Sequence, residues 1–229
     1  MTTMTAPLLA QRSVRNHLYA TYRLPFLIFA GLFALAWTLL TVLFVLNRDL
    51  AAADIADIWR WGTAPPAKYF LFTIALIIAS VQLRIYVAFG LTRRDVVLGS
   101  FRFFGPAVLF IATFSLVLYG VIALVSWLLG SPLLADPAPA DGALAAALAM
   151  VGFVAWVVSG LLIGVGFVRF GAWGGIAFSA LGAIPAAASE LAYLRFGPLA
   201  ILVVAVAVLA GGWAVPVLAR GVEVRKVAS

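Results

Sequence analysis

Long uninterrupted runs of apolar residues recur along the chain and limit what it can fold into. Residues 24–46 form the first run, and comparable runs follow as far as residue 219. A helix of about 20 apolar residues crosses the ~30 Å hydrocarbon layer of a bilayer. Only 10% of the residues are charged, against roughly 25% in soluble domains. The pattern predicts an all-α, polytopic membrane protein, and the ~10-residue alternation typical of a membrane β-barrel is absent from the sequence.

Six membrane-spanning helices are predicted, forming one transmembrane domain over residues 24–219. They are expected at about 24–46, 68–89, 103–129, 143–168, 171–187 and 198–219. The fifth is the shortest, and Pro185, which has no backbone N–H to donate, interrupts it. Whether this fifth helix crosses the bilayer completely stays open. Residues 220–229 are expected to form a tail, and no connecting segment is long enough for a soluble domain.

The segment that precedes the first span, residues 1–23, is basic and weakly amphipathic. Val14, Leu18 and Tyr22 recur in it at helical spacing, which predicts a helix lying in the membrane interface. A frayed basic terminus is the alternative. The single histidine of the chain, His17, lies here and has no second histidine with which to hold a metal or haem.

The distribution of basic residues predicts the orientation, because cytoplasmic loops are enriched in lysine and arginine. One side of the predicted bundle carries Arg12, Arg15, Arg23, Arg84, Arg93, Arg94, Arg102, Arg169, Arg220, Arg225 and Lys226. The other side carries Arg48, Arg60, Lys68 and Arg195, together with most of the acids. Both termini are therefore expected in the cytoplasm. These loops also explain the net charge of +7 without nucleic-acid binding.

The composition indicates where such a protein resides. Arginine far outnumbers lysine, and alanine is abundant, which is typical of proteins from GC-rich bacterial genomes. We therefore expect a multi-pass protein of the bacterial cytoplasmic membrane.

The segment between the second and third spans has the signature of one helix ending and another beginning. Gly90 tolerates the left-handed geometry of a helix C-terminal cap. Thr92 and Asp95 have the spacing of a capping box, in which two side chains satisfy backbone N–H groups reciprocally. Asp95 also lies in the first turn, where the helix dipole favours an acid. The sequence therefore predicts a sharp turn followed by a new helix.

That new helix is expected to be short and to lie along the membrane surface over residues 90–102. It would turn Arg93 and Arg94 toward water. The apolar residues facing lipid or protein would be Val96, Val97, Leu98 and Phe101. Arg84, in the last turns of the second span, is expected at the cytoplasmic surface or extended toward it. A charge well inside hydrocarbon costs about 2.5–3.5 kcal/mol or more.

Small residues cluster in the fourth and fifth predicted spans. Gly160 and Gly164 form one G-x-x-x-G pair, and Gly171 and Gly175 form another. Such pairs let helix backbones approach closely, so these glycines are predicted to pack neighbouring helices together. A surface along which helices slide, or a dimer seam, is the functional alternative.

Residues 185–198 are predicted to form a broken or re-entrant hairpin, and they hold a candidate outer gate. The gate would consist of Pro185, Glu190 and Arg195. An acid close to the bilayer is a candidate functional residue. At the interface, however, an acid costs little, so an ordinary surface position is the alternative.

Catalytic and cofactor-binding patterns are missing from the sequence. It has no cysteine, no pair of acids inside a predicted span, and no glycine-rich phosphate loop ending in Lys-Ser or Lys-Thr. We therefore expect no enzyme activity, and no metal or cofactor held by this chain.

The topology and the 89–99 segment together resemble the permease subunits of ABC transporters of the type-2 exporter class. In that class the segment between spans two and three often runs aromatic or small residue, Gly, apolar residue, Thr-Arg-Arg, and then an apolar helix ending in Gly. Here the chain reads Phe89-Gly90-Leu91-Thr92-Arg93-Arg94-Asp95, with Leu98-Gly99 at the end. The resemblance covers the whole chain in topology but only this short stretch in motif. The outer segment between spans five and six is shorter than an elaborate gate requires.

The resemblance implies a cytosolic ABC ATPase dimer that binds ATP and Mg²⁺, and a second permease subunit, identical or homologous. The implied ATPase contacts are Arg84, Gly90, Thr92, Arg93, Arg94, Asp95 and Leu98, with Arg12 and Arg15 from the pre-span helix. Two alternatives stay open. A non-transporting membrane scaffold or assembly protein would have no ATPase partner, and a membrane-embedded enzyme is disfavoured by the missing side chains. Substrate and transport direction do not follow from the sequence.

Overall fold

The computed structural model describes residues 5–46, 66–128, 139–195 and 197–220, and every regular element in these ranges is a helix. Five helices are long and apolar enough to cross a membrane, which fits a multi-pass membrane protein. These candidate spans are Leu8–Leu39, Pro66–Ala88, Arg93–Leu118, Ala149–Leu191 and Leu202–Arg220. The predicted connections around 47–65 and 129–138, and the tail beyond residue 220, lie outside the described residues.

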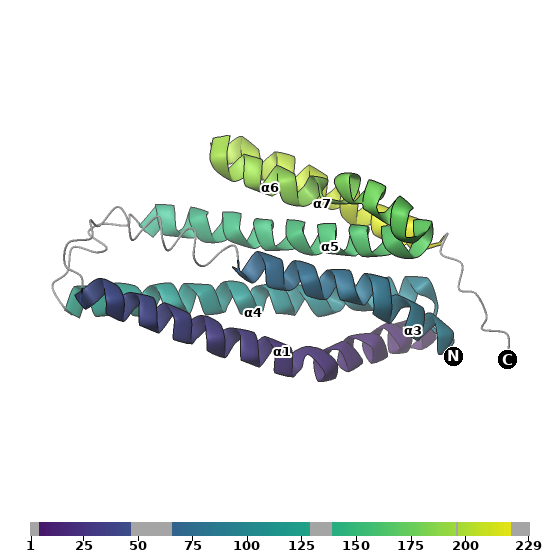
Figure 1. Cartoon of the computed structure of the whole chain (residues 1–229), viewed down its shortest axis with the longest axis horizontal. Coiled ribbons are helices and arrows are strands. Elements are labelled where there is room, and N and C mark those ends of the chain that lie inside the picture. The colour runs from purple at the N-terminus through teal and green to yellow at the C-terminus, as the bar shows by residue number, and fades with distance from the viewer. Residues whose placement is uncertain (1–4, 47–65, 129–138, 196, 221–229) are drawn as a thin grey trace.

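The helices form an elongated bundle with their long axes roughly aligned (Figure 1). Its elements are α1 (Thr5–Leu46), the Pro66–Ala88 helix with η1 (Ile78–Gln82) and α3 (Leu83–Ala88) inside it, α4 (Arg93–Leu128), α5 (Pro139–Gly182), α6 (Ile184–Arg195) and α7 (Gly197–Arg220). α5 is the central helix and contacts η1, α4, α6 and α7. α1 packs against α4 on the far side of the bundle from α6 and α7 (Figure 1).

Aromatic contacts fix the relative directions of the first three long helices. Tyr19 lies 5.1 Å from Phe103 between ring centroids, and Phe33 lies 6.3 Å from Phe114, so α1 and α4 run parallel. The Pro66–Ala88 helix runs the other way, because it meets the N-terminal half of α1 through Tyr86. The start of the Pro66–Ala88 helix therefore lies far from the start of α4, beside the middle of α1, where Phe70 stacks on Phe29 (Figure 1).

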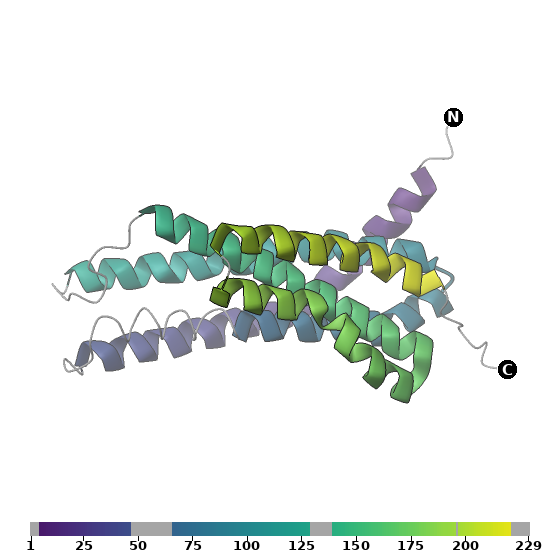
Figure 2. The same ribbon diagram turned by 90° about the horizontal axis from the view of Figure 1, so that it is seen from above.

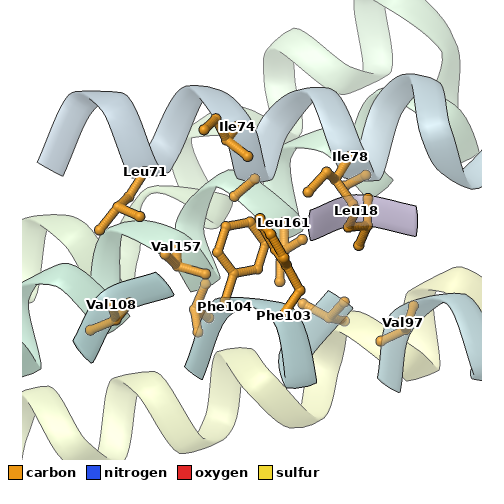
Figure 3. Close-up of a cluster of buried hydrophobic side chains, with 14 of the residues drawn as sticks. Leu18, Leu71, Ile74, Ile78, Val97, Phe103, Phe104, Val108, Val157 and Leu161 are labelled. Atoms are coloured by element: carbon orange, nitrogen blue, oxygen red, sulfur yellow. The ribbon is translucent and has the colours of Figure 1, made fainter. Parts of the chain in front are cut away.

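The core lies where α1, the Pro66–Ala88 helix, α4 and α5 meet (Figure 3). Phe103 is 1% exposed and packs among Leu18, Ile78 and Leu161, each from a different helix. The apolar stripe of the predicted interfacial helix, Val14, Leu18 and Tyr22, belongs to this core. The amphipathicity of the N-terminal segment thus reflects packing against protein.

Two helices predicted to be separate surface elements are continuous with the spans that follow them. α1 is a single helix of 42 residues, so the pre-span segment runs directly into the first span. α4 is a single helix of 36 residues from Arg93 to Leu128, so the prediction of a short surface helix over 90–102 is wrong. At 1.5 Å per residue α4 is about 54 Å long, which exceeds the ~30 Å hydrocarbon layer.

The physical reason for this continuity is burial on both sides of the predicted boundary. Val96 and Val97, from the predicted surface helix, are as buried as Phe103 and Phe104 from the predicted span. Hydrophobic packing against α1 and the Pro66–Ala88 helix therefore favours one straight extension into the bundle. Pro106 lies inside α4 and does not end it.

A glycine reverses the chain between the fourth predicted span (143–168) and the fifth (171–187). Gly171 has φ 73° and ψ −171°, a left-handed φ that favours glycine. Close contacts pair Gly166 with Phe178 and Gly182 with Ile163, which is the pattern of an antiparallel helical hairpin (Figure 2). A Cβ on Gly171 would meet nothing within 4 Å. Gly171 therefore makes the turn, and its predicted packing role is wrong.

The returning arm of this hairpin extends further than the predicted fifth span. It continues to Gly182 and, after Ala183, as α6 to Arg195. Backbone hydrogen bonds from Ala183 to Ser179 and from Ala187 to Ala183, both 2.9 Å, carry the helix across the junction. Pro185 lies in the first turn of α6, where its missing N–H costs little. The broken or re-entrant hairpin predicted over 185–198 is therefore wrong.

The first glycine pair packs α5 against the Pro66–Ala88 helix, as predicted. A Cβ on Gly160 would lie 2.6 Å from the backbone oxygen of Phe72, and one on Gly164 would lie 2.6 Å from the Cβ of Ala79. Both glycines are buried. The pair is thus used inside the chain and is not a dimer seam. Gly175 also packs closely, against Phe167 across the hairpin.

Replacing Gly164 with leucine is expected to destabilise the bundle strongly. The new Cβ would lie 2.8 Å from the Leu76 carbonyl oxygen as well as overlapping Ala79, and backbone cannot move aside as a side chain can. Overpacking of this kind costs about 1–3 kcal/mol or more. Gly120→Leu on α4 is the matched control, because a Cβ there meets nothing within 4 Å. Equal thermal stability of the two purified variants in detergent would contradict the packing.

Candidate functional site

One end of the bundle collects most of the described arginines, and we call it the arginine-rich end. Exposed arginines there are Arg12, Arg84, Arg94, Arg169 and Arg220. Two hydrogen bonds tie its elements together: Arg93 Nη1 donates to the Arg220 carbonyl oxygen at 3.1 Å, and Arg169 Nη1 donates to that of Leu218 at 3.2 Å. The start of α1 and the end of α7 lie at this end (Figure 1). Arginines on the last carbonyls of α7 also complement its dipole.

The turn between α3 and α4 has the C-terminal cap geometry predicted for Gly90. Gly90 has φ 88°, and its N–H donates to the Val87 carbonyl oxygen at 3.0 Å. The N–H of Leu91 donates to the Tyr86 carbonyl oxygen at 3.1 Å. These two bonds make a Schellman motif, which satisfies the last carbonyls of the helix. Phe89, beside the glycine, is 82% exposed.

The start of α4 is capped by the residues that the sequence indicated. The Asp95 N–H donates to Thr92 Oγ1 at 3.1 Å, and the Thr92 hydroxyl donates to Asp95 Oδ2 at 2.5 Å. The Asp95 carboxylate therefore accepts a hydrogen bond from the Thr92 hydroxyl. In a standard capping box it accepts one from the backbone N–H of the N-cap residue.

A contact that sequence reasoning missed joins this turn to α1. Gln11 Nε2 donates to Asp95 Oδ1 at 3.0 Å, and both side chains are buried. Nearby, a Cβ on Gly99 would lie 2.8 Å from the Cβ of Val14, so α1 and α4 approach closely. The N-terminal part of α1 and the start of α4 thus form one packed unit. Gln11 precedes Val14 by three residues on the same helix face, so a polar residue on a buried stripe was the available signal.

The structure divides the predicted ATPase contacts into inward and outward groups. Asp95 is buried, Leu98 is half-buried, and Arg93 is half-buried with its guanidinium on α7. Arg15 is also half-buried and donates to Asn16 Oδ1 at 3.0 Å. The contacts that face outward are Arg12, Arg84, Gly90, Thr92 and Arg94.

Truncating Asp95 is expected to loosen the arginine-rich end. Asp95→Ala removes the acceptor for both Gln11 and the Thr92 hydroxyl, leaving a buried amide unsatisfied. Such a loss costs about 1–3 kcal/mol. Amide hydrogen exchange should then rise in residues 8–18 and 90–97. Arg94→Ala, next in the chain and exposed, is the control, and similar exchange in both variants would contradict the link.

Away from the arginine-rich end, an ion pair joins three helices. Lys68 Nζ donates to Glu190 Oε1 at 2.7 Å, and Trp156 Nε1 donates to the same oxygen at 2.9 Å. The side chain of Lys68 is 11% exposed and that of Glu190 is 43% exposed. Tyr69 and Phe72 meet the Trp156 ring edge-on, at 5.0 and 5.6 Å between centroids. The Pro66–Ala88 helix, α5 and α6 are therefore fastened together here.

Of the candidate gate residues, Glu190 has described side-chain hydrogen bonds, from Lys68 and Trp156. The sequence did not indicate either of these partners. The side chain of Arg195 lies outside the described part of the chain. Pro185 is buried, and the N–H of the next residue, Ala186, donates to Ser159 Oγ of α5 at 3.0 Å. The start of α6 is thus held by α5 from within the bundle.

Within the described ranges, no group of three or more His, Cys, Asp or Glu side chains could hold a metal ion. No family model matches the chain, and neither a curated protein nor a solved structure gives a match.

Proposed function

We propose that this chain is the transmembrane permease subunit of an ABC transporter, an exporter driven by a separate cytosolic ATPase. The observation that carries the proposal is the arginine-rich end, where a capped turn is fastened to α1 and presents Phe89, Arg84 and Arg94 outward. Phenylalanine and arginine are both enriched at protein–protein interfaces relative to the rest of a protein surface. ATP and Mg²⁺ would bind to the partner ATPase.

In this proposal the arginine-rich end faces the cytoplasm of a bacterium and both termini lie there, in keeping with the positive-inside rule. The reversal at Gly171 supports six crossings of the cytoplasmic membrane, with 172–195 as the fifth. A second permease subunit, identical or homologous, would complete the pathway within membrane lipid, without nucleic acid.

The continuity of α4 suggests how an ATPase would act on the pathway. A force applied at Arg94 acts on the first turn of a 36-residue helix. The same force reaches α1 through Asp95 and Gln11. Movement of a docked ATPase dimer would therefore tilt α1 and α4 together, which is a rigid-body change of the kind known in transporters.

The test is purification of the full chain from its native membrane in mild detergent, with identification of co-purifying proteins by mass spectrometry. We expect an ABC-type ATPase whose ATP hydrolysis changes when the chain is bound. A scaffold or assembly protein would bring other membrane subunits and no ATPase, under conditions that preserve the complex. That result would overturn the permease proposal.

A further inference from the structure

An apolar groove of about 500 Å³ runs along the bundle surface between α4, α5 and α7. This volume lies within the range of ligand pockets, about 300–1,000 Å³. Residues that line it include Phe101, Gly105, Leu109, Val154, Gly212 and Trp213. The two glycines open into it, because a Cβ on either would meet nothing within 4 Å. The groove is therefore deeper than it would be if positions 105 and 212 carried larger side chains.

Arginines continue the groove toward the arginine-rich end. Arg94 and Leu98 precede Gly105 by eleven and seven residues, so the three lie on one face of α4. On α7, Arg220 follows Trp213 by seven residues and lies on its face. Both arginine side chains are exposed. The hydrogen bond from Arg93 to the Arg220 carbonyl oxygen brings the start of α4 and the end of α7 together.

A third arginine flanks the same groove. Arg102 precedes Gly105 by three residues and Leu109 by seven, and its side chain is exposed. Its aliphatic stem can lie along the apolar wall while its guanidinium extends toward water. The site is thus apolar along its length and positively charged at one end.

We propose that this groove binds one anionic phospholipid, with an acyl chain along Phe101 and Gly212 and the phosphate between Arg94 and Arg220. Guanidinium groups bind phosphate through paired charge-assisted hydrogen bonds. Basic pockets between membrane helices on the cytoplasmic side are known to bind anionic headgroups. Charge complementarity therefore selects a lipid over an apolar helix as the occupant. The site rests on the proposed cytoplasmic placement of the arginine-rich end but requires no ATPase, so failure to bind lipid and failure to bind an ATPase are distinguishable results.

The test is native mass spectrometry of the full chain in detergent, titrated with phosphatidylglycerol or phosphatidylcholine. We expect one phosphatidylglycerol to be retained at about tenfold lower lipid concentration than phosphatidylcholine, which corresponds to ~1.4 kcal/mol. Gly105→Leu and Gly212→Leu fill the groove and should abolish this retention. Arg94→Gln combined with Arg220→Gln should remove the preference for phosphatidylglycerol and leave weak retention of both lipids.

Gly120→Leu is the matched control, because Gly120 also lies on α4 and a Cβ added there would meet nothing within 4 Å, but Gly120 does not line the groove. It should retain phosphatidylglycerol like the unmodified chain, and millimolar inorganic phosphate should not displace the lipid. Equal retention of the two lipids, or unchanged retention in both groove-filled variants, would overturn the proposal. Conversion of a dimer to a monomer by Gly212→Leu would also overturn it, since a second copy would then occupy the groove.

Discussion

Reversing the charges of Arg84 and Arg94 together is expected to abolish binding of the proposed ATPase partner while the bundle stays folded. Both side chains are exposed at the arginine-rich end, one on each side of the Gly90 turn. Ion pairs at an exposed rim contribute only about 0–1 kcal/mol each, so a single neutral substitution can be silent. Arg84→Glu with Arg94→Glu replaces attraction by like-charge repulsion, which costs several kcal/mol at a contact. Co-purification and ATP-dependent transport should both be lost.

Controls must separate docking from stability and topology. Arg84→Gln with Arg94→Gln removes attraction without repulsion and should give intermediate binding. Arg23→Glu reverses an exposed arginine further along α1 and should keep the ATPase. Because the double reversal removes two basic charges, orientation is checked with Ser13→Cys, which should stay shielded from impermeant thiol reagents in intact cells. If the reversed variant binds the ATPase with unchanged affinity, this turn is not the docking element.

Arg93 is left out of this design because its structural role differs from the one predicted. The sequence placed Arg93 and Arg94 side by side on a surface helix, with equal exposure to water. In the structure the guanidinium of Arg93 turns inward to a carbonyl of α7, so reversing it would disturb the fold as well as the surface. Adjacent residues on a helix point about 100° apart, and the neighbour that each meets depends on the packed bundle.

The local features of the turn could be predicted because they depend on few residues. Gly90 and Thr92 act through backbone geometry within a few positions, and their bonds confirm the predicted cap and helix start. The end of an apolar run, by contrast, indicates where the chain leaves the hydrocarbon layer, and the helix itself can continue beyond that point. α4 therefore begins well before the predicted third span, because Val96 and Val97 are held in the core.

The second glycine pair shows a limit of motif spacing. Gly171 and Gly175 have the same separation as Gly160 and Gly164, yet one member makes a turn and the others pack. Glycine serves both purposes, since a missing Cβ allows positive φ as well as close approach. Spacing alone does not distinguish them, and the contacts across the hairpin decide which use applies.

The Lys68–Glu190 ion pair could not be predicted from the sequence, because the two residues are 122 positions apart. Reversing either charge is expected to lower thermal stability. Lys68→Glu would place two carboxylates together, and Glu190→Lys two ammonium groups. Breaking a buried pair costs about 3–5 kcal/mol, but Glu190 is 43% exposed, and solvent screening reduces the expected cost to about 1–3 kcal/mol.

The double swap, Lys68→Glu with Glu190→Lys, should recover most but not all of that stability. It restores opposite charges, but Trp156 Nε1 loses the carboxylate oxygen that it meets at 2.9 Å. A hydrogen bond to a charged group contributes about 1.5–3 kcal/mol when buried and less when partly exposed. In a Trp156→Phe background, which keeps an aromatic ring beside Tyr69, the swap should therefore recover all of the stability lost by the single reversals. The melting temperatures of the purified single, double and Trp156→Phe variants test these expectations. If the double swap is no more stable than either single reversal, the three helices are held together by packing alone.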